Sequence, residues 1–239
     1  MAAMTEVEAE KQRAAVVAVD RVRPGMVLAL GTGSTAAYAV RALAARLPEL
    51  ASLVTVASSR ATEDLARNLG LRVRDLEADE EFDLMIDGAD EVGPHLELTK
   101  GGGGAMFREK FLARLSKEIV IVVDHTKLVD HLGSRVPIPI EVVPFARPVI
   151  IRQLARRGLA ARSRMGGTEV VRTDNGNEIL DLFPFPPLTD PKALDRELRD
   201  IPGVVETGIF IDLADRVLVG LTDGSVREIL PSSPRTRSG

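Results

Sequence analysis

The sequence predicts an α/β fold in which a Rossmann-like parallel-sheet domain carries a smaller, inserted α+β domain. In the first half of the chain, short apolar runs alternate with helical stretches, which is typical of a parallel sheet covered on both faces. Further along, the predicted elements follow the order βαββαβ, the split unit of a ferredoxin-like domain. The 239 residues suffice for one or two domains. We therefore predict an α/β domain over residues 1–132 and 210–239, interrupted by an insertion over 133–209.

The first domain is expected to open with a helix and then to alternate strands with helices. Pro24 and Gly25 end the first helix and Gly70 closes a later one, because neither residue type continues a helix easily. The strands are recognised as short apolar runs. The expected helices cover residues 6–22, 36–47, 61–70 and 105–116, and the expected strands cover 26–30, 53–57, 83–86 and 118–124.

The insertion is expected to hold four strands and two helices. Residues 174–177, Asp-Asn-Gly-Asn, supply a tight turn between two of the strands. Pro191 lies in the first turn of the second helix, where proline is favoured. In chain order the elements are strand 137–144, helix 146–158, strands 168–173 and 178–183, helix 190–201 and strand 204–210; a final hairpin, 216–221 with 226–230, returns to the first domain.

Composition excludes several classes of function. A formal charge of -4, 3% aromatic residues and no Trp argue against a nucleic-acid-binding protein. No apolar run approaches the roughly 20 residues that span a bilayer, and the opening stretch "MAAMTEVEAEKQR" has no apolar signal core, so a cytoplasmic location is expected. The absence of Cys excludes thiol chemistry. His95, His125 and His131 show no ligand spacing, so we expect no metal site, and we treat His95 and His125 as incidental polar residues.

The stretch "LGTGSTAAYAV", residues 30–40, follows a strand and opens a helix. Glycines there leave room for an anion, and the free N–H groups of a helix start attract a phosphate. The stretch also satisfies G-x-G-x-x-A, the dinucleotide-binding fingerprint. The second strand ends in Ser58-Ser59-Arg60, and Arg60 would suit the 2′-phosphate of NADP. Phosphate binding, NADP binding and a plain strand–helix turn therefore remain open.

A second motif, "LMIDGADEVGPHLELTKGGGGAMFREKF", covers residues 84–111. Asp87 and Asp90 follow the strand 83–86, at the carboxyl edge of the sheet where open α/β folds bind ligands. The first glycine loop and Asp124 follow two other strands at the same edge. We therefore expect three separate segments to converge on one crevice.

The second half of this motif supplies a lysine, bare backbone and a further carboxylate. Consecutive glycines cost backbone entropy, so Gly101–Gly104 need a reason, such as N–H groups that approach an oxyanion. Phe107 and Phe111 belong to an apolar helix stripe, and Glu109 lies about 200° from Phe107, off that stripe. With Lys100, these groups are what proton abstraction beside a carbonyl requires. The alternative is a solvated acidic loop with a glycine hinge.

The chain resembles the ribose-5-phosphate isomerases of the A type over nearly its whole length. The resemblance depends on "GTGSTA", "IDGADEV" followed by "TKGGGGAMFREK", "VVDHTK", "PIPIEVVPFA" and "TDNGNEILD", in this order. It implies the interconversion of ribose 5-phosphate and ribulose 5-phosphate without a cofactor, in a homodimer or a tetramer. Gly104 departs from the family pattern, where alanine is common.

The resemblance also implies roles for individual residues. Glu109 would be the base that moves a proton between C1 and C2 through an enediolate, and Asp87 would assist ring opening. Lys100 and Asp90 would bind and polarise the substrate's oxygens. Substrate and phosphate binding would fall to Thr32, Gly33, Ser34, Thr35, Lys127 and Lys11, and to the backbone of Gly101, Gly102 and Gly103.

Two other functions remain as hypotheses. An NADP-dependent oxidoreductase would use the dinucleotide fingerprint and Arg60. A non-catalytic sugar-phosphate sensor would need a DNA-binding helix-turn-helix, and the stretch before the first strand has room for only one helix. The isomerase hypothesis is the one that uses both motifs.

Overall fold

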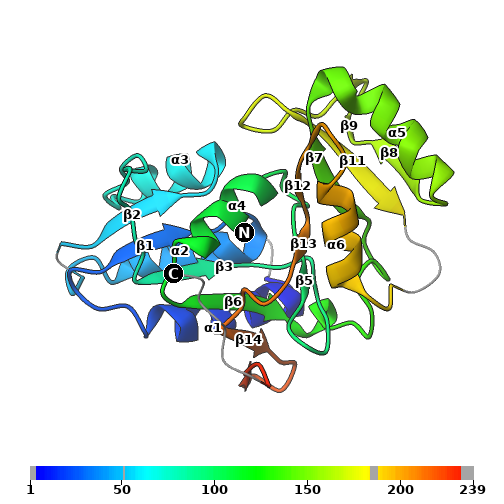
Figure 1. Ribbon diagram of the computed structural model, residues 1–239. Helices are drawn as coiled ribbons and strands as arrows, with labels where there is room; N and C mark the ends of the chain where they lie inside the picture. The colour runs from blue at the N-terminus through cyan, green and yellow to red at the C-terminus, as the bar shows by residue number, and fades with distance from the viewer. Residues whose placement is uncertain (1–3, 51, 184–187, 233–239) are drawn as a thin grey trace. The chain divides into compact units, whose positions relative to one another are not determined.

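The computed structural model describes residues 4–50, 52–183 and 188–232, and internal contacts divide the chain into two compact units (Figure 1). The first unit comprises Met1–Ala89, Arg108–Lys127 and Asp212–Gly239. The second unit comprises Asp90–Phe107 and Leu128–Ile211. It contains the whole of the predicted insertion, together with residues 90–107, which the predicted boundaries assign to the α/β domain.

The first unit is built on a six-stranded sheet with the order β15-β14-β6-β3-β1-β2. Five strands run parallel, and β15 pairs antiparallel with β14 as the predicted terminal hairpin. The α/β prediction is thus confirmed. Because β1, β3 and β6 are parallel neighbours, the segments that follow them leave the sheet at one edge. The strands are β1 (Val27–Leu30), β2 (Val54–Ala57), β3 (Leu84–Asp87), β6 (Ile119–Asp124), β14 (Arg216–Gly220) and β15 (Val226–Ile229).

Helices of this unit begin and end close to the predicted positions. Thr5 and Glu8 form a capping box at the start of the first helix, and Ser59 caps the third. The first helix packs against β6 and β14, with Ala14 and Ala18 fully buried in the core. The helices are α1 (Glu6–Val19), α2 (Ser34–Ala45), α3 (Arg60–Asn68), α4 (Met106–Arg114), which begins in the second unit, and the short 3₁₀ helix η1 (His125–Lys127).

The second unit contains a four-stranded antiparallel sheet with the order β12-β7-β11-β8. Along the chain its main elements follow one another as β7-α5-β8-β11-α6-β12. This βαββαβ order is that of a ferredoxin-like domain, as predicted. The elements are β7 (Ile138–Val142), η2 (Pro144–Ala146), α5 (Arg147–Arg156), β8 (Ala160–Ser163), β11 (Glu178–Phe183), α6 (Pro191–Arg199) and β12 (Val204–Thr207).

The strand predicted over 168–173 is wrong. The second strand of the sheet is β8, and residues of the predicted strand contribute only β10 (Glu169–Val170), which pairs with β9 (Met165–Gly166) in a two-stranded ribbon. The sequence of β8, Ala-Ala-Arg-Ser, carries no apolar run, because β8 is an edge strand with partly exposed side chains. Apolar patterning therefore selected the neighbouring "TEVVRT" instead.

A small three-stranded sheet, β13-β5-β4, was not predicted at all. The strand expected over 204–210 breaks at Gly208 into β12 and β13 (Ile209–Phe210), and β13 pairs with β5 (Leu98–Thr99), which pairs with β4 (Glu91–Val92). Asp90 directly precedes β4 and Lys100 directly follows β5. The sheet therefore fixes the backbone on either side of two predicted site residues.

Glu91 is the buried carboxylate that ties this small sheet to the following loop. Its two oxygens accept the backbone N–H groups of Gly133 (2.6 Å), Arg135 (2.7 Å) and Val136 (3.3 Å). The Thr99 hydroxyl donates to the same carboxylate at 3.0 Å. Buried N–H groups without an acceptor are costly, so Glu91 is a structural residue.

No helix within the described ranges is long and apolar enough to cross a membrane.

Glu91→Ala is expected to lower the free energy of unfolding by about 2–4 kcal/mol, because it deprives three part-buried N–H groups and the buried Thr99 hydroxyl of their acceptor. Glu97→Ala is the control, since that half-exposed carboxylate accepts the N–H of exposed His95 at 2.8 Å. Urea unfolding followed by circular dichroism measures both. Equal, small effects of the two substitutions would contradict the assigned role of Glu91.

Candidate active site

Asp87 and the first glycine loop lie against each other at the carboxyl edge of the first unit's sheet. Asp87 is the last residue of β3 and is fully buried. Its Oδ1 accepts the N–H groups of Thr32 (3.2 Å) and Gly88 (2.7 Å). A Cβ on Gly31 would lie 1.9 Å from that oxygen, so only glycine permits the approach. The carboxylate thus orients the start of the loop.

The glycine loop leads directly into α2. Gly33, with φ 109°, is the residue that precedes the helix, and Ser34 is its first residue. Both are exposed, whereas Thr35 is buried. The amide groups at this helix start therefore face an accessible surface, the arrangement that favours phosphate.

The Thr32 side chain, unlike its exposed neighbours Gly33 and Ser34, lies among other hydroxyl groups. Its hydroxyl lies 2.8 Å from the hydroxyl oxygens of both Ser58 and Ser59, and 3.4 Å from that of Thr62. Ser59 also caps α3, and Arg60 is the exposed first residue of that helix. The serines that end the second strand are thus part of a hydroxyl cluster, which the sequence pattern did not reveal.

Lys11 brings α1 to the same edge. Its Nζ donates to Ser34 Oγ at 3.2 Å and lies 3.8 Å from Asp124 Oδ2. Asp124 ends β6, and its Oδ1 accepts the Thr126 N–H at 3.0 Å. Lys127 follows as the half-buried last residue of η1. Within the first unit, segments after β1, β3 and β6 and one lysine of α1 are therefore brought to one edge.

His125, treated as incidental above, is held by a buried carboxylate. Glu10, fully buried, accepts the His125 N–H at 3.2 Å and lies 2.7 Å from His125 Nδ1. The hydrogen bond to Glu10 raises the pKa of His125, burial opposes the shift, and the charges of Glu10, Asp124 and Glu6 add to it. The pair links α1 to η1 beside Lys11 and Lys127.

Glu109 lies on the buried side of α4. It is 3% exposed, and Met106 and Lys110 on the same side are also buried. Phe111 is 44% exposed, so the predicted apolar stripe is not the buried face. The buried face carries charged residues, and amphipathic patterning therefore selected the opposite side of the helix.

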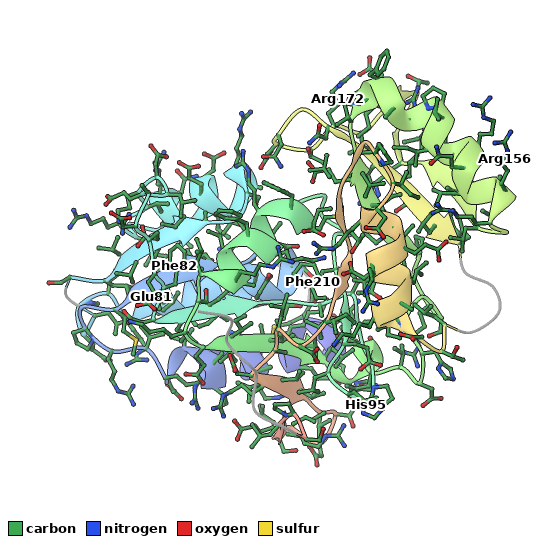
Figure 2. All side chains as sticks on the ribbon, in the orientation of Figure 1. Glu81, Phe82, His95, Arg156, Arg172 and Phe210 are labelled. Atoms are coloured by element: carbon green, nitrogen blue, oxygen red, sulfur yellow. The ribbon has the colours of Figure 1, made fainter. Side chains whose placement is uncertain are left out.

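Lys100 and Asp90 are fixed within the second unit. The Lys100 N–H donates to Gly208 O at 2.8 Å, and its buried Nζ lies 5.5 Å from the ring centroid of Phe210, which Figure 2 labels on β13. The Asp90 N–H donates to Thr99 O at 2.8 Å, and Asp90 Oδ2 accepts the Gly102 N–H at 2.7 Å. The Gly102 amide, expected to approach an oxyanion of a ligand, thus contacts a carboxylate of the chain.

Gly101 is required by its surroundings. Its φ is +104°, and an added Cβ would lie 2.8 Å from Pro139 Cγ and 2.9 Å from Met106 Cε. Gly102 and Gly103 are exposed. The glycine run is therefore a constrained turn and not a flexible hinge.

Comparison with known proteins identifies the family. A family model described as ribose 5-phosphate isomerase A (phosphoriboisomerase A) matches residues 54–224. The ribose-5-phosphate isomerase A of Thermomicrobium roseum is 46% identical over 219 residues, which cover 91% of this chain and 92% of that protein. The chain belongs to the ribose 5-phosphate isomerase A family.

Other members of the isomerase A family agree with this assignment. The ribose-5-phosphate isomerase A of Chloroflexus aurantiacus is 46% identical over 223 residues, covering 92% of this chain and 93% of that protein. The solved ribose 5-phosphate isomerase A of Methanocaldococcus jannaschii has a TM-score of 0.86 and 41% identity, covering 92% of this chain and 98% of that one. The Plasmodium falciparum ribose 5-phosphate isomerase has a TM-score of 0.91 and 34% identity, covering 95% and 100%. These comparisons give no support to the NADP-dependent alternative.

A histidine titration followed by proton NMR tests the Glu10–His125 pair in this member of the isomerase A family. Because the folded-state pKa is raised, the pair's contribution to stability is fully present below the unfolded value of 6.5 and is lost as pH rises through the folded value. The His125 ring signal should titrate above pH 6.5 in the native chain and at a lower pH in Glu10→Gln. The same pKa in both proteins would contradict the pairing.

Proposed function

We propose that this chain is an aldose–ketose isomerase that interconverts D-ribose 5-phosphate and D-ribulose 5-phosphate in the non-oxidative pentose phosphate pathway. The observation that carries the proposal is sequence identity of 46% to ribose-5-phosphate isomerase A proteins over about nine tenths of the chain. Within the first unit, the buried carboxylates of Asp87 and Glu109 suit the same chemistry.

Glu109 is proposed as the base. Its carboxylate removes the proton from C2 of the open-chain aldose, the electron pair of the C–H bond forms the C1–C2 double bond, and the C1 carbonyl oxygen becomes the enediolate oxygen. The proton then returns from Glu109 to C1, and the C2 hydroxyl proton passes to the C1 oxygen, so that C1 becomes the CH2OH group and C2 becomes the ketone. A carboxylate that is 3% exposed has few water molecules competing with the substrate for its oxygens, which supports this role.

Asp87, Lys100 and Asp90 are proposed to act on the substrate's oxygens. The Asp87 Oδ1 is occupied by two backbone N–H groups, which fix the carboxylate for ring opening and hydroxyl proton transfer. Lys100 supplies a buried ammonium for the developing oxyanion, where low solvent exposure strengthens electrostatic stabilisation. Asp90 is proposed to bind a substrate hydroxyl beside its contact with Gly102.

The phosphate is proposed to bind at the start of α2. Exposed Gly33 and Ser34, with the neighbouring Thr35, offer backbone N–H groups at a helix N-terminus. Thr32, whose own N–H is held by Asp87, is proposed to line the same pocket. Lys11 already donates to Ser34 Oγ, and a second positive charge would come from Lys127. The backbone of Gly101, Gly102 and Gly103 is proposed as a further contact for the sugar.

The proposed reaction transfers protons within one substrate, so it requires neither a redox cofactor nor a metal ion. We propose that the enzyme acts in the cytoplasm as a homodimer or a tetramer.

Glu109→Gln is expected to lower kcat by about 10²–10⁴-fold, because the amide cannot accept the C2 proton. Glu63→Gln, at a part-buried carboxylate of α3 that pairs with Arg67, is the matched control and should keep native turnover. A coupled assay of ribulose 5-phosphate formation measures both, with circular dichroism to show that each variant is folded. Near-native turnover in folded Glu109→Gln would refute its role as base.

A further inference from the structure

Arg164, which follows β8 in the second unit, makes a set of contacts that no role assigned so far explains. Its backbone is fixed on both sides, since its N–H donates to Ile179 O at 2.9 Å and its carbonyl accepts the Val171 N–H at 2.9 Å. Its side chain is 17% exposed. The guanidinium therefore extends from a rigid position in the sheet.

One edge of the guanidinium forms a fork with Asp181, a residue of β11. Arg164 Nε donates to Asp181 Oδ2 at 3.0 Å, and Nη2 donates to Oδ1. Two parallel bonds of this kind set the plane of the guanidinium as well as its position. Since β11 is the neighbour of β8, this fork is local to the sheet.

The remaining nitrogen contacts the glycine run that follows Lys100. Arg164 Nη1 donates to Gly101 O at 2.7 Å and to Gly102 O at 3.0 Å. One side chain thus holds two successive carbonyl groups, which lie 63 and 62 residues before it in the sequence.

The first of these peptide groups is held at both ends. The peptide between Gly101 and Gly102 has its carbonyl on Arg164 at 2.7 Å and its N–H on Asp90 Oδ2 at 2.7 Å. A planar peptide with both polar groups fixed cannot rotate about the chain. Asp90 and Arg164 therefore act together on the orientation of this turn.

The orientation of the second peptide group, between Gly102 and Gly103, follows from the same planarity. In a trans peptide the N–H points opposite to the carbonyl, so binding of Gly102 O by Arg164 directs the Gly103 N–H to the other side. Gly103 is exposed. An N–H oriented in advance is the kind of donor that stabilises an oxyanion without reorganisation during the reaction.

We propose that Arg164 is a positioning residue for the isomerisation, whose guanidinium fixes the peptide groups that follow Lys100 so that the Gly103 N–H is oriented toward a developing oxyanion. The proposal rests on the proposed isomerase function. A lysine could not replace the arginine, because an ammonium offers a point charge and not a planar fork that binds a carboxylate and two carbonyls at once.

Arg164→Ala is expected to lower kcat by about 10–10²-fold and to change KM by less than about 3-fold, because preorganised donors act mainly on the transition state. Arg162→Ala is the matched control, since Arg162 lies in β8 and its guanidinium is 5.2 Å from the exposed Phe183 ring. Arg162→Ala should keep native kcat and KM. Guanidinium chloride at tens of millimolar should restore part of the lost kcat in Arg164→Ala only.

A purely structural role would lower the melting temperature without changing kcat of the folded fraction, and it would show no rescue. Native kcat in folded Arg164→Ala, or a loss that guanidinium does not restore, would overturn the proposal. Arg164→Lys keeps the stem and the charge in case the alanine variant does not fold; it should lose about 10-fold in kcat, and native turnover would overturn the proposal equally. Absence of turnover in the native chain would refute the isomerase function itself. Failure of the isomerase function is thus distinguishable from failure of the Arg164 proposal.

Discussion

Carboxylates that accept backbone N–H groups are the constraint on which both units of this structure depend. Asp87 holds the backbone of Thr32 and Gly88, and Asp90 holds Gly102. Glu91 holds three N–H donors, at Gly133, Arg135 and Val136, in the loop after η1. Each carboxylate lies at or beside the end of a strand, where the chain must turn while its polar groups are removed from water. The acidic motif thus supplies acceptors that the adjoining loops need in order to fold.

The same constraint explains why glycine and charge occur together in the sequence. A Cβ on Gly31 would lie 1.9 Å from Asp87 Oδ1, and one on Gly102 would lie 2.8 Å from Asp90 Oδ1. At these two positions the carboxylate approaches the backbone closely because the glycine has no side chain, so the two residue types are paired in space. Catalytic groups proposed for the isomerisation are by this means preorganised, since their carboxylates are already fixed by the fold.

Much of the fold follows from the sequence, and the exceptions have definite physical causes. Alternation of apolar and helical stretches predicted the parallel sheet of the first unit, and the βαββαβ order predicted the ferredoxin-like unit. The edge strand β8 was missed because its side chains are partly exposed, and β4 and β5 because two residues each carry no periodicity. The buried face of α4 was misassigned because it contains Glu109 and Lys110.

The site residues themselves stand out in the sequence, but the residues that support them do not. A sequence motif identifies a loop when the residues proposed to bind the substrate lie close together in the sequence. Arg164 contacts Gly101 across 63 positions, and Glu10 contacts His125 across 115, so no local pattern links either pair. Such supporting contacts form only when the fold has brought distant segments together. A single sequence does not show which distant residues are close in space.

The central claim is that the chain moves a proton between C1 and C2 of ribose 5-phosphate. The most direct measurement is ketose formation from ribose 5-phosphate in deuterated water, with metal-free and nucleotide-free protein, followed by NMR at C1 through many turnovers. Deuterium that accumulates at C1 of ribulose 5-phosphate is the result expected from an enediolate whose proton exchanges with solvent. Ketose that stays unlabelled after prolonged equilibration, or no ketose at all from protein shown to be folded, would contradict the account.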